Sequence, residues 1–79
     1  MLHARPDYNR IQDPANLIPE DEPVFLVRAQ DVCSVATMDR WIEFARISGA
    51  SQDIIDLASD QMERMKDWQL NHKVKVPDL

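Results

Sequence analysis

The chain's only glycine, Gly49, lies between two stretches whose apolar residues recur at helical spacing. Glycine readily adopts the left-handed conformation that ends a helix, so Gly49 predicts a sharp break in the chain. A connection this short makes two helices antiparallel neighbours. The sequence therefore predicts a mainly α fold, an antiparallel two-helix hairpin with helices within residues 34–49 and 51–71.

Each predicted helix has a serine at its start and an apolar face along its length. Ser34 and Ser51 are the expected N-cap residues, because a serine hydroxyl accepts a hydrogen bond from the first turn. In the first helix the apolar face spans Val35, Met38, Trp41, Ile42, Phe44 and Ala45. In the second it spans Ile54, Ile55, Leu57, Ala58, Met62, Met65 and Trp68. The first face covers about half of the circumference, which is wider than one partner helix covers and predicts a second contact.

The N-terminal residues 1–23 differ in composition from the helices. They hold four of the five prolines and an acidic run, Glu20–Glu22. Proline fixes its own φ and disfavours a helical conformation in the residue before it, so we expect an extended arm. Apolar side chains for docking this arm on the hairpin, or on a neighbouring copy, are Tyr8, Leu17 and Ile18.

A short apolar run, VFLV at residues 24–27, follows the arm. Within residues 24–31 it is either a short buried strand or a helical turn, and its β-branched and aromatic content favours the strand. A strand needs a partner, which a symmetry-related copy would supply. The tail, residues 72–79, is expected to be extended.

The length of 79 residues bounds the chain to one small domain, residues 1–79. A core this small is marginal, and a single cysteine leaves no disulfide to reinforce it. We therefore expect self-association, with a homodimer as the simplest form. The single cysteine and the absence of an apolar leader predict a cytoplasmic protein. No run of about 20 apolar residues indicates a membrane span.

Acidic residues form the most regular pattern in the sequence. Five of them recur at spacings of three, four, three and four and define an acidic ridge: Asp53, Asp56, Asp60, Glu63 and Asp67. The ridge is either a solvated face, softened by an Asp60–Arg64 ion pair, or a surface that docks on a basic partner and imitates a nucleic-acid backbone. With a formal net charge of -5, direct binding to nucleic acid is not expected.

The residues that carry catalysis in other proteins are sparse in this sequence. Cys33, His3 and His72 have no flanking catalytic signature, and we expect Cys33 to be a buried, inert thiol. The single glycine excludes a glycine-rich phosphate loop. We predict a non-enzymatic protein without a metal or other cofactor.

A possible anion or nucleotide site follows the VFLV run. The Arg28 guanidinium stands near the expected start of a helix, where free N–H groups attract anions. The alternative is an ion pair between Arg28 and Asp31 or another acidic group. The residues such a site would use are Arg28, Gln30, Asp31, Arg40, Tyr8 and Trp41.

The same region carries a resemblance to a family. The segment Glu22-Pro23-Val24-Phe25-Leu26-x-Arg28-Ala29-Gln30-Asp31, a following helix with Trp41, and the ending Lys75-x-Pro77-Asp78 resemble small phage and prophage proteins of unassigned function. The resemblance runs from about Pro19 to the C-terminus. It departs at Val35, where a proline is expected to open the helix.

The resemblance implies a phage setting and no particular chemistry. In that setting we expect a counter-defence accessory protein that binds and occludes a host protein through the acidic ridge. One alternative is an oligomeric sponge that holds a small anionic signalling nucleotide at a subunit junction, using Arg28, Arg40, Tyr8 and Trp41. A second alternative is a structural or assembly protein.

Overall fold

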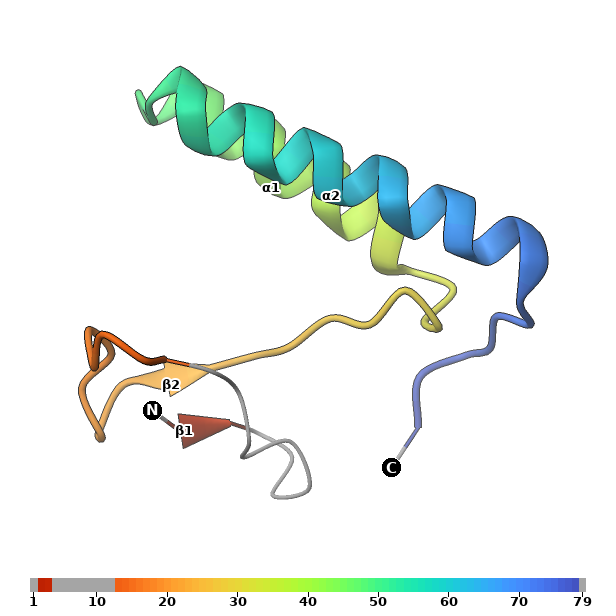
Figure 1. Cartoon of the computed structure of the whole chain (residues 1–79), viewed down its shortest axis with the longest axis horizontal. Helices are drawn as coiled ribbons and strands as arrows, with labels where there is room; N and C mark the ends of the chain where they lie inside the picture. The colour runs from red at the N-terminus through yellow and green to blue at the C-terminus, as the bar shows by residue number, and fades with distance from the viewer. Residues whose placement is uncertain (1, 4–12, 79) are drawn as a thin grey trace.

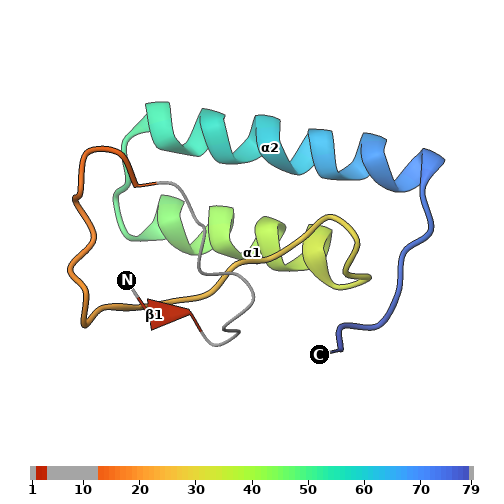
Figure 2. The same ribbon diagram turned by 60° about the horizontal axis from the view of Figure 1, so that its bottom comes forward.

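The computed structural model describes residues 2–3 and 13–78 of the chain (Figure 1). Two helices dominate it, α1 at Ser34–Ile47 and α2 at Gln52–Asn71. Two short strands, β1 at Leu2–His3 and β2 at Pro23–Val24, precede them. The helices run side by side in opposite directions (Figure 2), which confirms the predicted mainly helical hairpin.

The turn between the helices forms as its glycine predicts. Gly49 has φ +86°, in the left-handed region, and nothing lies within 4 Å of the position a Cβ would take. Its N–H donates to the Arg46 carbonyl at 3.1 Å, and the Ala50 N–H donates to the Ala45 carbonyl at 2.9 Å. These two bonds are the Schellman pattern that closes a helix C-terminus. Gly49 is therefore required by its backbone conformation and not by crowding.

The two predicted serine caps differ. Ser51 does occupy the N-cap of α2, with an extended backbone and no side-chain cap bond. Ser34 does not cap α1, because the cap position is Cys33 and Ser34 is the first helical residue. Ser34 is instead fully buried, with its hydroxyl 3.5 Å from the Ala29 carbonyl, to which it donates. A buried hydroxyl needs such a partner, and it finds one in the preceding loop.

The core lies along one narrow stripe between the helices. Its buried residues are Ile42, Ile55 and Ala58, with Met38, Ala45 and Met62 packed against them. The predicted inner faces are too wide, because several of their members remain exposed: Trp41, Phe44, Ile54, Leu57 and Trp68. Two helices touch only along the line where their surfaces meet, so the flanks of both apolar faces stay uncovered.

The strand predicted within residues 24–31 is shorter than expected and has a different partner. β2 pairs in parallel with β1, in the register Leu2↔Pro23 and His3↔Val24. The partner strand comes from this chain's own N-terminus, so pairing with a second copy is not needed. After β2 the chain leads to the start of α1 (Figures 1 and 2), and its residues Phe25 and Val27 line a groove together with residues of both helices.

The predicted arm, residues 1–23, is described only in part, since residues 4–12 lie outside the described residues. Its last section folds into turns. The Asp13 carboxylate accepts the backbone N–H groups of Leu17 and Ile18, each at 3.1 Å. Leu17, expected to dock, is exposed instead.

The C-terminal tail returns to the start of α1. The Lys75 N–H donates to the Gln30 carbonyl at 3.0 Å, and the Val32 N–H donates to the Lys75 carbonyl at 2.9 Å. The side-chain amide of Gln69 donates to the Ala29 carbonyl at 3.0 Å. These contacts close the open end of the hairpin. Neither described helix has the length and apolar character needed to cross a bilayer.

Candidate binding surfaces

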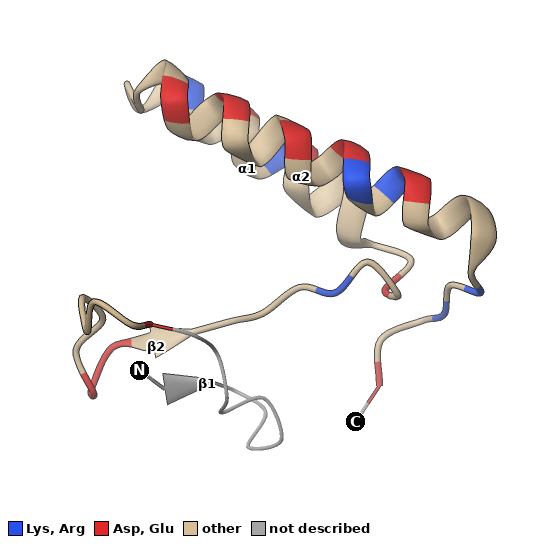
Figure 3. Cartoon of the chain, in the orientation of Figure 1, with Lys and Arg blue, Asp and Glu red and all other residues tan. Residues whose placement is uncertain are grey.

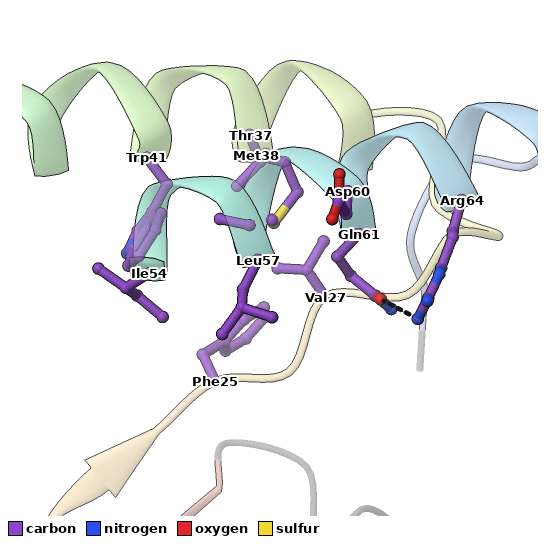
Figure 4. Close-up of a pocket in the computed structure, with 11 residues that line it drawn as sticks. Phe25, Val27, Thr37, Met38, Trp41, Ile54, Leu57, Asp60, Gln61 and Arg64 are labelled. Carbon is purple, nitrogen blue, oxygen red and sulfur yellow. Dashed lines mark hydrogen bonds between the residues drawn. The ribbon is translucent and has the colours of Figure 1, made fainter. Parts of the chain in front are cut away.

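An apolar groove of about 590 Å³ lies beside the line where α1 meets α2 (Figure 4). Ala58 belongs to the core and Met38 packs against it, while Trp41, Ile54 and Leu57 form the uncovered walls. The remaining lining residues are Phe25, Val27, Thr37, Asp60, Gln61 and Arg64. Three segments that are separate in sequence therefore build one concave surface.

Helical spacing explains why the groove exists. On α2, the groove residues Ile54, Leu57, Gln61 and Arg64 repeat at intervals of three, four and three residues. They form a second stripe next to the buried one, turned away from α1. Leu57 is 66% exposed although the sequence places it with the core residues. Clustered exposed apolar side chains mark interaction surfaces, whereas single ones are ordinary.

Phe25 and Val27 complete the groove from outside the hairpin. Both belong to the VFLV run, which the sequence predicts to be buried. Phe25 is 70% exposed, and Figure 4 shows Ile54 and Leu57 pointing toward the segment that carries it. Because all four residues of the run are apolar, its sequence carries no signal that Phe25 is exposed while Leu26 and Val27 are half-buried.

The acidic ridge is exposed along its whole length. Figure 3 shows the acidic residues distributed along α2. At about 100° per residue, the ridge lies on the far side of α2 from the buried stripe. Its five carboxylates extend over about 20 Å at 1.5 Å rise per residue. The ridge residues predicted from the sequence therefore share one face.

The ridge has few partners among the described residues. Lys66 pairs with Glu63 at 3.1 Å, and the Gln52 amide donates to Asp56 at 2.8 Å. The predicted Asp60–Arg64 ion pair is replaced, since Arg64 donates to the Gln61 side-chain oxygen at 3.4 Å. Of the five ridge carboxylates, Glu63 alone has an ion pair among the described residues, and with Lys66 and Arg64 nearby the ridge keeps a net negative charge.

The residues of the predicted anion site do not line one pocket. Gln30 and Asp31 are engaged by the tail through the Asp31↔Lys75 bridge. Arg40 pairs with Glu43 at 3.3 Å on the exposed surface of α1. Of the five described members, Trp41 alone lines the groove, and Tyr8 lies outside the described residues.

Arg28 and Asp31 form a turn. The Arg28 N–H lies 3.4 Å from the Asp31 carboxylate, and the Asp31 N–H donates to the Arg28 carbonyl at 2.9 Å. The Asp31 carboxylate therefore holds the main chain of Arg28 beside the start of α1. This contact explains the aspartate at position 31. It uses only the main chain of residue 28 and so does not explain the arginine side chain.

The remaining residues that could carry out chemistry are Cys33 and His72, and each has a structural setting that does not suggest catalysis. Cys33 is exposed, which corrects the prediction of a buried thiol: the core stripe of α1 begins one residue later, at Ser34. The His72 Nδ1–H donates to the Trp68 carbonyl at 2.7 Å, and its ring stacks on Trp68 with centroids 4.0 Å apart. His72 thereby satisfies a carbonyl at the end of α2. Over residues 2–3 and 13–78, no three metal-binding side chains gather.

Comparisons with protein-family models, with curated proteins and with solved structures find no match to this chain.

Proposed function

We propose that the chain is a non-enzymatic protein that acts by stoichiometric binding to a basic surface of another protein, through the acidic ridge. The observation that carries the proposal is the exposure of all five ridge carboxylates on one helix, with one lysine among them as counter-charge. Such a strip attracts a basic partner over long range and fixes its orientation on contact.

The resemblance to phage and prophage proteins defines the setting of the proposal. In that setting the partner is a host protein, and binding occludes the basic surface that the host protein uses elsewhere. A counter-defence protein acting in the host cytoplasm fits this description. The nucleotide sponge receives less support, because Arg40 pairs with Glu43 on the surface of α1 and does not line the groove that Trp41 lines.

The test compares two variants with equal changes in charge. In the first, Asp56→Lys and Asp67→Lys reverse two exposed ridge positions that do not line the groove. In the second, Glu20→Lys and Asp21→Lys reverse two exposed acidic residues that precede β2. Wild type and both variants are immobilised and exposed to host extract, and retained proteins are quantified by mass spectrometry.

We expect one host protein to be retained by wild type and by the Glu20/Asp21 variant, and to bind the ridge variant about 10-fold or more weakly. Retention should also fall between about 0.1 M and about 1 M salt, since the screening length shrinks from about 10 Å to about 3 Å. The proposal is contradicted if both variants lose the same amount of retained host protein. It is also contradicted if the retained amount changes neither with salt nor with reversal of the ridge charges.

A further inference from the structure

The groove leaves large apolar side chains in water. Phe25, Leu57 and Trp41 are each exposed, and Phe44, three residues after Trp41 on α1, is 63% exposed. The buried apolar core has only three members among the described residues. More large apolar side chains therefore line or border the groove than fill the core, an imbalance that an additional contact would relieve.

The chain exposes more area than a compact monomer of its mass. The chain exposes 6389 Å², whereas a folded monomer of its mass, 9.2 kDa, is expected to expose about 4,900 Å². Its radius of gyration is 13.8 Å, against about 11.6 Å for a compact chain of 79 residues. The excess, about 1,500 Å², belongs to the whole extended chain and not to the groove alone, and it is compatible with the roughly 800 Å² that each partner contributes to a standard interface.

Charge favours a second copy of the chain as the occupant. The groove rim carries one acid, Asp60, and one base, Arg64, so it is close to neutral although the chain carries a formal net charge of -5. In a two-fold symmetric contact, residue i of the first copy meets residue j of the second, and residue j of the first copy meets residue i of the second. Asp60 and Arg64 can then face each other twice, whereas a strongly basic segment would meet Arg64.

The acidic ridge does not oppose this arrangement. It is centred on the far side of α2 from the core, and of its members only Asp60 reaches the groove. Two copies joined at their grooves thus keep Asp56, Glu63 and Asp67, which lie farther round α2, in solvent. We propose that the groove between α1 and α2 is the interface of a two-fold symmetric homodimer. This inference does not depend on the proposed binding to a host protein.

The test is a matched pair of substitutions on α2. Leu57→Asp places a charge in the groove wall, and Leu70→Asp makes the same change at a residue that is exposed but does not line the groove. Sedimentation velocity over a dilution series measures the dissociation constant of each. Each change occurs twice in the dimer, so Leu57→Asp should raise the constant by about 100-fold or more. Leu70→Asp should leave it within a few fold of wild type.

Circular dichroism verifies that each variant is helical, which is expected because both leucines are exposed. If Leu57→Asp fails to fold, Ile54→Asp replaces it, since an aspartate in the first turn of α2 is favoured by the helix dipole. A second readout uses Trp68→Phe, which leaves Trp41 as the only tryptophan. Trp41 emission should shift to shorter wavelength as the protein concentration rises through the dissociation constant.

A wild-type chain that stays monomeric at every concentration overturns the proposal, whether the groove is empty, holds a small apolar adduct, or is covered by the chain's own N-terminal segment. Equal weakening by Leu57→Asp and Leu70→Asp overturns it as well. The Asp56→Lys and Asp67→Lys variant should remain dimeric. The ridge proposal and the dimer proposal can therefore fail separately.

Discussion

Replacing Ile55 by alanine should remove a large part of the stability of the fold. Ile55 is 2% exposed and is the largest fully buried side chain among the described residues. Truncating a buried isoleucine to alanine costs about 2–5 kcal/mol, and we take about 3 kcal/mol here because the small core can partly close around the cavity. A chain of 79 residues has a total free energy of unfolding of about 4–12 kcal/mol. The loss should lower Tm by about 12–24 °C.

The matched control is Ile47→Ala on α1, where the isoleucine is 76% exposed. Both variants gain the same helix propensity from alanine, so their difference isolates burial. Urea unfolding followed by circular dichroism at one fixed protein concentration gives the two free energies, because the stability of a dimer depends on concentration. Ile47→Ala should change stability by less than about 0.5 kcal/mol. Equal destabilisation by both substitutions would refute the assignment of the core stripe.

Three further substitutions or reactions test other contacts. Gln69→Ala removes the amide that bonds the Ala29 carbonyl and the Ser34 hydroxyl, so it should cost about 1–3 kcal/mol in urea unfolding; an unchanged midpoint would show that this link is not formed. Gly49→Ala should cost about 1–2 kcal/mol in the same assay, from φ +86° alone, since no atom crowds the new methyl group. Cys33 should react fully with a thiol reagent such as DTNB without denaturant, and reaction only after unfolding would contradict its exposure.

Local patterns in the sequence were sufficient to predict the hairpin. The bounds of both helices agree with the prediction within about two residues. Gly49 identifies the turn because a left-handed residue is a property of a few neighbouring bonds. The acidic ridge could be predicted equally well, because residues three and four apart on a helix always share a face.

The groove was predicted poorly, for a physical reason. The apolar faces of both helices are about half a circumference wide, and hydrophobicity alone does not say which part meets the partner helix. Leu57 and Ile55 are equally apolar, yet one is 66% exposed and the other 2% exposed. Their difference depends on the rotation of each helix about its own axis. That rotation is set by packing between segments distant in sequence.

The sequence by itself determined the helical periods, the glycine turn between them, the acidic ridge and the composition that disfavours nucleic-acid binding. Each depends on residues within one or two helical turns, or on no geometry at all. Only the tertiary structure decided that Ser34 is buried against Gln69, that Cys33 is exposed, and that the tail pairs with the loop before α1. The position of the groove was also decided only by the tertiary structure. All of them depend on contacts between residues that are dozens of positions apart in the sequence. Such contacts form only when the chain folds.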